Sequence, residues 1–529
     1  MNRRLTIQLA AALLAGSTLL SSALGLYRDR LLNGLYYEDY KVGIDAYTAA
    51  FTIPDFMFFL LVSGALSVTF IPVFNQRVAT GNKKSAWQLS SSMINFMALI
   101  TLVTSILIII FAEPIMHILA PGLSESGMAL AISMMRVIAV NPFLFAIAAV
   151  IASIQQAVGR FAFYTLAPII YNVGIIIGAL WFTQGITIFG VEIFEGGIMG
   201  VALGVVLGSM MQLTVSAIGL VGLGFDYEFK IFWKNKGFRQ VLRLLPPRSI
   251  DQGMDYAVSL VEMNLASRMT EGTIRAYQQA TSLHLMPINL IGVAISTAAF
   301  PKMTERLGQG RPDLFRDELR TILRVIIWLA LPVSMITFFT RGYLVNFIYN
   351  GGDPLMAGLL GILVVAILFR SIYHIAARSF YAQQDTKTPL YISIVAIGLN
   401  IILAVWFTFT LELGAFGLAA AQSIVAALEV FILFAVMAGR MPGLFSRAFW
   451  SAIGRMASAT GLMAIVTYIM VSSLPLGASD QSFFSSFPKF LLIVTVSLVA
   501  YVLLSKLMSI EEANPVIKRT SRLFFGGSR

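Results

Sequence analysis

The sequence predicts an all-α integral membrane protein with about fourteen transmembrane helices. Of its 529 residues, 58% are hydrophobic and 12% are charged, and its mean hydropathy is +0.82, whereas soluble proteins carry about 25% charged residues. Apolar runs such as Ile94–Phe111 and Phe490–Leu504 are continuous, and they exceed the roughly 10 alternating residues of a membrane β-strand. Because lipid offers the backbone no hydrogen-bond partners, we expect these runs to be helices.

Breaks at Gly, Pro and charge clusters divide the chain into its predicted spans. Arg3 and Arg4 before the first run are typical of a signal peptide, but the run is long for one, so we expect a retained first span. We predict an N-lobe at 1–225, a C-lobe at 226–440, a C-terminal helix pair at 441–510 and a basic cytoplasmic tail at 511–529. The predicted spans are 5–27, 44–74, 86–112, 128–156, 161–184, 197–222, 240–267, 273–301, 321–348, 355–382, 388–410, 414–438, 447–474 and 486–507.

Basic residues concentrate in alternate loops, and this sets the predicted orientation. The loops 113–127 and 185–196 contain acidic residues and no Lys or Arg. The basic set of loops contains Arg77, Lys83, Lys84, Arg160, Lys230, Lys234, Lys236, Arg239, Lys302, Arg306, Arg311, Arg316, Arg320, Lys387, Arg440 and Arg447. By the positive-inside rule, the basic loops and both termini are cytoplasmic. The loop that contains Arg28 then lies on the outer side.

Several function classes are excluded by missing motifs. Cysteine is absent, and the three histidines, His117, His284 and His374, form no spaced ligand motif. No phosphate-binding loop, nucleophile elbow or zinc-protease motif occurs, so we expect neither an enzyme nor an ATP-driven pump. The net charge of +11 reflects the basic loops of a membrane protein and does not indicate nucleic-acid binding.

An internal repeat relates the two halves of the chain. The recurring sets, in matching order, are Ala65-Leu66-Ser67 with Pro72 and Ala294-Ile295-Ser296 with Pro301; Gln155-Gln156 with Asn172 and Gln383-Gln384 with Asn400; and Gly197-x-x-Gly200 and Gly414-x-x-Gly417. Equivalent spans are separated by six spans, an even number, so both copies share one orientation. We therefore predict two six-helix lobes around a central cavity, the architecture of an alternating-access transporter.

Charged residues near the first two spans are candidate site residues. Arg28 and Asp29 follow the first apolar run, where Arg28 either faces the cavity or extends to the headgroups beside a paired Asp29. Asp45 opens the second span and either binds substrate or stabilises a helix N-terminus. Arg136 lies in the middle of the fourth span, and we expect it to face the lobe interior as an ion-pair partner or a ligand for substrate anions.

The seventh span carries four charged residues on one helical face. Arg248, Asp251, Asp255 and Glu262 follow one another at spacings of three, four and seven. Arg248 and Asp251 are candidates for a neutralising pair. Asp255 and Glu262 have no obvious local partner, so the acids of this face, Asp251 included, are candidate sites for a coupling Na+ or H+.

The tenth span carries a cationic stripe. Arg370, His374 and Arg378 recur at spacings of four and therefore share one face. Two interpretations remain open for this stripe. It binds an anionic substrate, since arginine matches phosphate geometry with two parallel hydrogen bonds, or it contacts anionic headgroups at the inner membrane surface.

Several motifs resemble one transporter family. Ser21–Asp29 (SSALGLYRD) is similar to S-R-x-L-G-x-x-R-D, and Phe380–Pro389 (FYAQQDTKTP) to F-Y-x-x-x-D-x-K-T-P. Shorter matching elements are Asp45-Ala46-Tyr47, Ile53-Pro54-Asp55, Gly64–Ser67, Phe70-Ile71-Pro72 and Ala120-Pro121-Gly122. From about residue 20 to 390 the chain thus resembles the MurJ/MviN lipid II flippases of the multidrug/oligosaccharidyl-lipid/polysaccharide exporter superfamily.

The resemblance implies a fourteen-helix fold in a bacterial cytoplasmic membrane and a lipid-linked peptidoglycan precursor as cargo, moved from the inner to the outer leaflet. It also implies a terminal helix pair that receives a lipid tail, cavity arginines that bind the diphosphate, and a membrane potential or ion gradient as the driving force. We expect no cofactor apart from a coupling Na+ or H+ ion. We expect cell-wall synthesis proteins to be partners. The candidate cavity residues are Arg28, Asp45, Arg136, Arg370 and His374; the coupling candidates are Asp251, Asp255, Glu262 and Asn400; the gating or repeat turns contain Pro54, Gly64, Pro72, Pro287 and Pro301.

The sequence departs from the family pattern at the arginine cluster. Of the arginines expected near the substrate, Arg28 remains, while Ser22, Phe58, Phe59 and Ser282 occupy arginine positions. Each lost charge-assisted contact to a phosphate weakens binding by about 1.5–3 kcal/mol. Two alternatives to precursor transport therefore stand: a cation-coupled drug antiporter, indicated by the acids of the seventh span, and a transport-inactive module that recruits cell-wall machinery.

Overall fold

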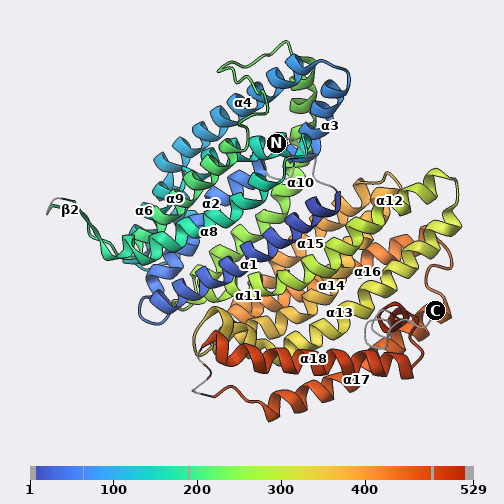
Figure 1. Cartoon of the computed structure of the whole chain (residues 1–529). Coiled ribbons are helices and arrows are strands. Elements are labelled where there is room, and N and C mark those ends of the chain that lie inside the picture. The colour runs from blue at the N-terminus through green and yellow to red at the C-terminus, as the bar shows by residue number, and fades with distance from the viewer. Residues whose placement is uncertain (1–6, 63–64, 189–190, 478–479, 481, 519–529) are drawn as a thin grey trace. The chain divides into compact units, whose positions relative to one another are not determined.

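The structure is a computed structural model of the chain (Figure 1). It describes residues 7–62, 65–188, 191–477, 480 and 482–518, without the side chains of 7–15, 65–68, 186–188, 191–193 and 246–255. Contacts divide the chain into two compact units, Met1–Arg275 (unit 1) and Ala276–Arg529 (unit 2). Each unit is described by itself.

Unit 1 is helical, with one short β-hairpin between α8 and α9. Its helices are α1 (Ile7–Tyr36), α2 (Lys41–Leu61), α3 (Ala65–Ala79), α4 (Lys83–Ile110), α5 (Ala112–Leu119), α6 (Glu125–Ile138), α7 (Asn141–Ala157), α8 (Ala162–Leu180), the 3-10 helix η1 (Phe182–Gln184), α9 (Met199–Ile218) and α10 (Lys236–Ser267). The antiparallel strands of the hairpin are β1 (Ile186–Ile188) and β2 (Val191–Phe194). The predicted all-α class is confirmed apart from this hairpin.

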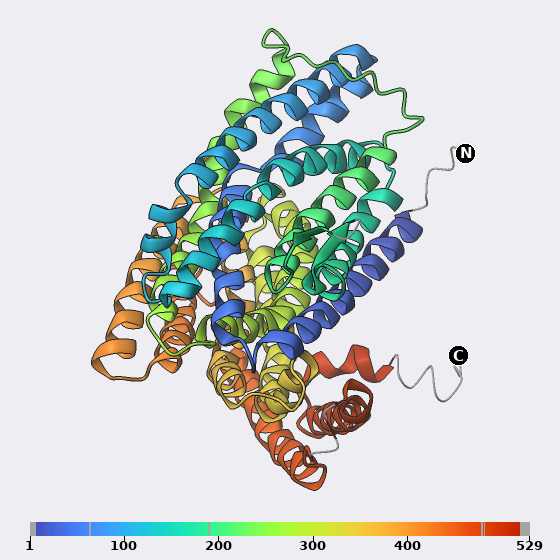
Figure 2. The ribbon, with the colours of Figure 1, turned by 90° about the vertical axis from the view of Figure 1, so that its left-hand side faces the viewer.

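Unit 2 continues the helical architecture. Its elements are α11 (Thr273–Ile288, which begins at the end of unit 1), the π-helix η2 (Asn289–Val293), α12 (Ala294–Gly308), α13 (Pro312–Ile348), α14 (Pro354–Ala382), α15 (Lys387–Val405), the π-helix η3 (Trp406–Thr410), α16 (Ala415–Arg440), α17 (Arg447–Ser473), α18 (Phe483–Leu507) and the 3-10 helix η4 (Glu511–Ala513). The C-terminal helices α17 and α18 lie side by side and both pack against α13 (Figure 1, Figure 2).

Twelve helical stretches of the described chain are long and apolar enough to cross a membrane, so the predicted count of fourteen is not confirmed. The predicted spans 5–27 and 240–267 fall in α1 and α10, which are not among the twelve. Charged residues of α10, including Arg239, Arg243 and Glu262, shorten its apolar run. The predicted continuous span 44–74 contains two helices, because α2 ends at Leu61 and α3 begins at Ala65.

Close helix packing in unit 1 depends on glycines. A Cβ atom on Gly174 of α8 would clash with the Cα of Gly208 in α9, and one on Gly178 would clash with the Cα of Gly204. Two helix backbones approach this closely only where no side chain separates them. Glycines at these positions therefore fix α8 against α9, and with α8 the residues it contributes to the candidate site.

A second packing centre of unit 1 joins α3, α4, α7 and α10. Phe70 and Phe74 of α3, Met93 of α4, Ile154 of α7 and Phe238 of α10 are fully buried in one apolar cluster. Burying a side chain of this size stabilises the fold by roughly 1.5–3 kcal/mol. The cluster holds the turn after α3, which we predicted to be cytoplasmic, next to the beginning of α10.

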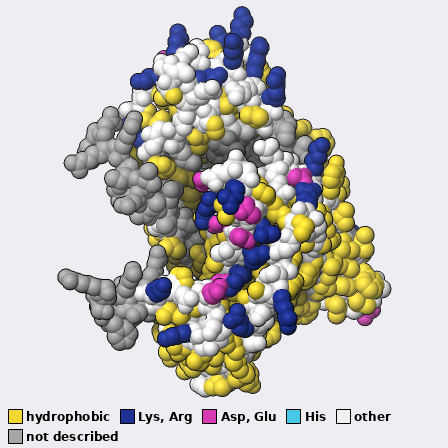
Figure 3. Space-filling model, turned by 90° about the vertical axis from the view of Figure 1, so that its right-hand side faces the viewer, with side chains coloured by type: hydrophobic (Ala, Val, Ile, Leu, Met, Phe, Trp, Pro, Cys, Tyr) yellow, Lys and Arg dark blue, Asp and Glu magenta, His cyan; other side chains and the backbone are white. Residues whose placement is uncertain are grey.

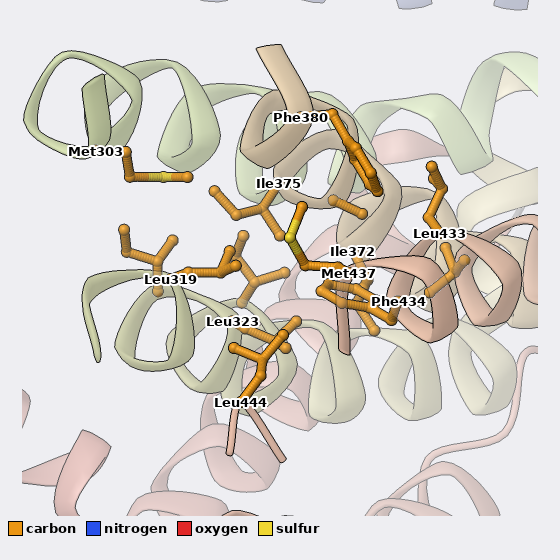
Figure 4. Packing of buried hydrophobic residues seen from close by; sticks show 14 of the residues in the cluster. Met303, Leu319, Leu323, Ile372, Ile375, Phe380, Leu433, Phe434, Met437 and Leu444 are labelled. Atoms are coloured by element: carbon orange, nitrogen blue, oxygen red, sulfur yellow. The ribbon is translucent and has the colours of Figure 1, made fainter. Parts of the chain in front are cut away.

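The core of unit 2 lies between α12, α13, α14 and α16. Met303, Leu319, Phe380 and Met437 point toward one another from these four helices (Figure 4). Leu444, which follows α16, closes the same cluster. The core thus holds α14, which carries the predicted cationic stripe, between its neighbours.

Equivalent contacts occur at repeat positions in the two units. A Cβ atom on Gly200 would lie 2.5 Å from the carbonyl carbon of Phe182, and one on Gly417 would lie 2.8 Å from the carbonyl carbon of Phe407. Both glycines therefore pack the start of one helix against the end of the preceding helical segment. Because the pattern recurs with the same geometry, the repeat describes structure as well as sequence.

Helix α10 belongs to unit 1 by its contacts, since it packs against α2 and α3. We predicted that this segment opens the C-lobe. A repeat boundary and a contact boundary need not coincide, because a segment can belong to one repeat and pack on the other. The lobe boundary at 225–226 stays a prediction.

Candidate functional site

Arg28 lies in a polar network near the end of α1. Its guanidinium donates two hydrogen bonds to Oδ1 of Asp29, at 3.0 Å from Nη2 and 3.3 Å from Nε, and a third from Nη1 to Oδ1 of Asn172 in α8 at 3.0 Å. Asn172 in turn donates to the carbonyl oxygen of Pro168 at 3.2 Å. The Arg28 side chain is 24% exposed. The guanidinium group of Arg28 is therefore held by residues of α1 and α8, while part of the side chain remains accessible.

Arg275 completes this network, and the sequence did not identify it as a site residue. Its Nη2 lies 3.4 Å from Oδ1 of Asp29, and its Nε donates to Oδ1 of Asn33 at 2.8 Å. Its side chain is 3% exposed, and a charge this deeply buried requires compensating partners. An arginine at the start of a predicted span is a sequence signal for a buried site, and Arg275 carries that signal.

Asp45 binds backbone amides. Its Oδ2 accepts a hydrogen bond from the N–H of Gly272 at 2.6 Å, and its Oδ1 accepts one from the N–H of Arg275 at 2.8 Å. These amides belong to the beginning of α11, where the first N–H groups of a helix have no partner within the helix. Asp45 lies in α2 and therefore caps the N-terminus of a different helix, α11. Its hydrogen bond with Arg275 links it to the Arg28 network.

Aromatic side chains occupy the positions where arginines were expected. Phe59 stacks on Tyr256 with ring centroids 4.2 Å apart, and Phe58 meets Phe145 edge-on at 5.5 Å. Phe145 also contacts Tyr171 at 5.2 Å. These contacts are typical of aromatic packing. Rings thus fill the positions at which the family pattern has paired arginines.

Arg136 does not face the interior of unit 1, contrary to our expectation. It is exposed on α6, whereas Met128, Ala131, Met135 and Ile138 are buried. Those residues recur every three or four positions and define the packed face of the helix, and Arg136 falls off that face. Its assignment as a substrate ligand stays a prediction.

The stripe of unit 2 has a protein counter-charge. Nη1 of Arg370 lies 2.9 Å from Oε2 of Glu429 in α16, and the glutamate side chain is 3% exposed. Oε1 of Glu429 accepts a hydrogen bond from Ser393 at 2.8 Å, and the Ser393 hydroxyl lies 3.2 Å from that of Tyr373. In our two interpretations of the stripe, the partner of its cations was an anionic substrate or anionic headgroups. The sequence signal we missed is Glu429 itself, an isolated acid in an apolar span.

The other two stripe residues lie near the π-helix η2. Nη1 of Arg378 donates to the carbonyl oxygen of Val293 at 3.3 Å and to the hydroxyl of Thr297. The half-buried His374 packs against Gly292, where an added Cβ atom would lie 3.1 Å from its Cδ2. Arg378 thus joins α14 to the point where η2 continues into α12.

His284 is a buried polar residue of the same unit. Its Nδ1 lies 2.6 Å from the carbonyl oxygen of Thr281, the residue is fully buried, and its Nε2 has no hydrogen-bond partner among the described residues. His284 lies two residues after Ser282, one of the positions at which the resemblance led us to expect an arginine. Its buried imidazole therefore packs in a stretch that lacks this arginine.

The two coupling candidates whose side chains are described lie in different units. Glu262 is 8% exposed in α10 of unit 1, and Asn400 is 5% exposed in α15 of unit 2. The side chains of Arg248, Asp251 and Asp255 lie outside the described residues. Within the described chain, no three His, Asp or Glu side chains form a group able to hold a metal ion.

The predicted turn residues lie within or beside interrupted helices. Pro54 and Pro72 are inside α2 and α3, and Pro287 and Pro301 are inside α11 and α12. Gly64 lies outside the described residues. A helix begins at Ala65 in one unit and at the equivalent repeat position, Ala294, in the other. Helices thus begin at equivalent repeat positions in both copies, and the gating role of the predicted turn residues stays a prediction.

Comparisons with known proteins agree with this architecture. A model of the lipid II flippase MurJ family matches residues 41–486. The "Probable lipid II flippase MurJ" of Thermotoga maritima is 24% identical over 510 residues, covering 95% of this chain and 97% of the relative. The lipid II flippase MurJ of Burkholderia cenocepacia is 25% identical over 404 residues, with 72% and 74% covered.

Solved structures show the same fold. A lipid II flippase MurJ in an inward closed conformation superposes with a TM-score of 0.74 at 23% identity, covering 94% of this chain and 98% of that one. An inward-facing MATE multidrug resistance transporter of the MOP superfamily gives a TM-score of 0.66 at 15% identity, with 80% and 95% covered. The family match across most of the sequence means that this chain belongs to the lipid II flippase MurJ family.

Proposed function

We propose that this protein moves lipid II, a lipid-linked peptidoglycan precursor, from the inner to the outer leaflet of the bacterial cytoplasmic membrane. The family match over residues 41–486 and the near full-length similarity to curated flippases support this function. The twelve candidate spans support a multi-pass protein of the bacterial inner membrane. The similarity to MATE transporters concerns the fold and does not favour drug transport.

The Arg28 network carries the proposal at the level of the site. Its guanidinium is held by Asp29 and Asn172 and remains partly exposed. Arginine pairs with phosphate through short charge-assisted hydrogen bonds. We infer that Arg28 contacts the diphosphate of the precursor, while Arg275 and Asp45 hold the surrounding backbone and side chains in place. Two arginines sharing Asp29 keep Arg28 oriented before the ligand arrives.

Transport by alternating access needs no ATP site, and none of the sequence motifs indicates one. We infer that a Na+ or H+ gradient, or the membrane potential, drives the cycle. Asn400 and Glu262 are the buried candidates for this coupling, since buried polar and ionisable residues in membrane helices commonly mark ion pathways. Asp251 and Asp255 remain candidates from the sequence.

Orientation and partners complete the proposal. The basic loops support cytoplasmic N- and C-termini. With that orientation, the precursor enters from the cytoplasmic leaflet and is released to cell-wall synthesis proteins on the other side. These proteins are the expected partners because they consume the polymerisable precursor.

The proposal is tested by replacing the resident flippase of a bacterial strain with this chain. We expect cells to grow and to accumulate precursor that an externally added precursor-cleaving enzyme can reach. An empty vector gives the baseline, and immunoblotting of membranes confirms expression. Expressed protein that leaves all precursor on the inner leaflet would reject flippase activity. Growth without precursor exposure would instead support a recruiting module, and ion-dependent drug efflux alone would support an antiporter.

A further inference from the structure

A basic pocket opens at one end of unit 1, between the turn that joins α3 to α4 and the segment before α10. Its volume is about 1040 Å³. Its lining includes five cations and no acidic residue: Arg77, Lys84, Lys230, Lys234 and Lys236. Figure 3 shows Lys and Arg side chains gathered at the top of the view, the end at which Figure 1 places α3 and α4. The pocket concentrates positive charge that no ion pair recorded for the described residues neutralises.

Hydrogen bonds to α4 hold the segment that forms one wall of the pocket. Residues 226–235, here called the strap, run antiparallel to α4. They are hydrogen-bonded to serine and asparagine residues along that helix. The bonds are Glu228 N–H to Ser91 Oγ (3.2 Å), Phe232 N–H to Ser92 Oγ (2.9 Å), Asn235 Nδ2 to the Ser85 carbonyl (3.0 Å), and Asn95 Nδ2 to the carbonyls of Glu228 (2.8 Å) and Lys230 (3.1 Å). The strap therefore fixes the backbone from which Lys230 and Lys234 project.

Two long helices direct their N-termini toward this pocket. Helix α4 begins at Lys83 and α10 at Lys236, and both first turns contribute lining residues. The Arg77 side chain packs on the first turn of α10, where a Cβ atom added to Gly237 would clash with its guanidinium. The positive ends of the helix dipoles add to the side-chain charges and favour an anion there.

The strap also exposes aromatic rings beside its lysines. Phe229 is 91% exposed, Trp233 54% and Tyr227 46%. Trp233 is held in place by Phe238 at 5.5 Å and by Phe96 at 6.0 Å. Exposed aromatic residues next to lysines are typical of segments at the level of lipid headgroups. A ligand of the pocket can thus combine a phosphate with an adjoining acyl chain.

We propose that this pocket binds the phosphate group of an anionic ligand at the cytoplasmic membrane surface. Lysine and arginine side chains without protein counter-charges attract phosphate, and a phospholipid headgroup and a free phosphate share that chemistry. The pocket is lined by other residues than the Arg28 network, so the proposal does not rest on the transported cargo.

The test compares a pocket variant with a charge-matched control in the purified full-length protein. The pocket variant is Lys84→Gln/Lys230→Gln/Lys234→Gln, and the control is Lys83→Gln/Lys387→Gln/Arg447→Gln, exposed residues that do not line the pocket. The probes are phosphatidylglycerol in phosphatidylcholine nanodiscs, followed by native mass spectrometry, and inorganic phosphate, followed by calorimetry.

We expect the pocket variant to bind phosphatidylglycerol about a hundredfold more weakly than wild type, since each cation near an anionic headgroup contributes about a fivefold gain. The control variant should bind it as wild type does. Inorganic phosphate binding that depends on the same three lysines would support the pocket with a soluble anion as its ligand. Equal binding of both probes by all three proteins, or equal losses in both variants, would overturn the proposal.

Discussion

At the residue scale, Asp45 illustrates how one carboxylate joins distant parts of unit 1. Its two oxygens bind the amides of Gly272 and Arg275, which lie at the opposite end of this unit in sequence. The same carboxylate is 3% exposed, so both hydrogen bonds are shielded from water. Hydrogen bonds to a charged group contribute about 1.5–3 kcal/mol each, and buried donors left without partners are costly.

We predict that Asp45→Ala destabilises the protein by about 2–4 kcal/mol, because two buried amides lose their acceptor. Asp45→Asn keeps one acceptor oxygen and should lose less. The measurement is the thermal unfolding midpoint of the detergent-purified protein. Asp39→Ala serves as the control, since Asp39 is exposed in the turn before α2. An unchanged midpoint in Asp45→Ala would show that the cap is dispensable.

Asp385 is a second capping residue, in the connection between α14 and α15. Its Oδ2 accepts a hydrogen bond from the Thr388 hydroxyl at 2.6 Å, its Oδ1 accepts the N–H groups of Lys387 and Thr388 at 3.0 Å, and Arg440 lies 2.7 Å away. The hydrogen bonds from Thr388, reinforced by Arg440, hold the pKa of the Asp385 carboxyl well below its usual range. The F-Y-x-x-x-D-x-K-T-P motif thus has a structural reason for its acid.

Acid should weaken this cap. The pKa of Asp385 is lower in the folded protein than in the unfolded chain, where it is about 3.9. Its stabilising contribution is therefore complete above about pH 5 and is lost as the pH falls through the unfolded-state pKa toward the folded-state pKa. We predict that Asp385→Asn lowers the unfolding midpoint at neutral pH and reduces its decline between about pH 5 and 3. Asp226→Asn, at an exposed loop residue, should follow the wild-type profile, and parallel curves for Asp385→Asn and wild type would contradict the assignment.

Single residues also mark the limit of what the sequence could predict. The spacing of Arg370, His374 and Arg378 placed them correctly on one helix, and Arg28 was correctly grouped with Asp29. Their partners Glu429, Asn172 and Arg275 lie on other helices. Periodicity along one helix carries no information about which side chain faces it from another, so these pairs required the tertiary structure.

At the element scale, the sequence predicted the helical repeat well and the interruptions within it poorly. The recurrence of the Ala-x-Ser element in the two halves coincides with helix starts at Ala65 and Ala294. In unit 2 the interruption is the π-helix Asn289–Val293, which continues directly into α12. A π-helix has the composition of an ordinary helix, and its extra residue per turn is set by packing, so apolar periodicity predicted one continuous span.

The glycines of the repeat give a matched prediction for both copies. Gly200→Ala and Gly417→Ala each force a Cβ atom to within 3 Å of a neighbouring backbone, so we expect each to lower the unfolding midpoint, at a cost of about 1–3 kcal/mol. Gly398→Ala in α15 is the control, because nothing lies within 4 Å of its added Cβ. It should be neutral or stabilising, since alanine favours a helix more than glycine by up to about 1 kcal/mol. A lower unfolding midpoint in only one of the two variants would indicate that the two contacts are not equivalent.

At the scale of the whole molecule, composition alone predicted the membrane class and the motifs predicted the family, which the match over residues 41–486 confirms. The count of spans was less secure, because α10 carries both charged residues and apolar stretches. Its packing on α2 and α3 depends on contacts between segments that are far apart in the chain. Composition and local order therefore predict the type of architecture, whereas the grouping of helices into compact units follows from side-chain packing.

Transport itself should depend on Arg28. We predict that Arg28→Ala slows precursor exposure at the outer leaflet by at least about tenfold, since one charge-assisted contact to a phosphate contributes about 1.5–3 kcal/mol. Arg28→Lys keeps the positive charge without the planar fork and should recover part of the rate. Asp29 retains Arg275 as a partner in both variants, so we expect normal amounts of folded protein by immunoblot. Arg447→Ala, at an exposed position where α17 begins, controls for the loss of one positive charge. Equal precursor exposure in Arg28→Ala and Arg447→Ala, at equal protein amounts, would remove Arg28 from the transport path.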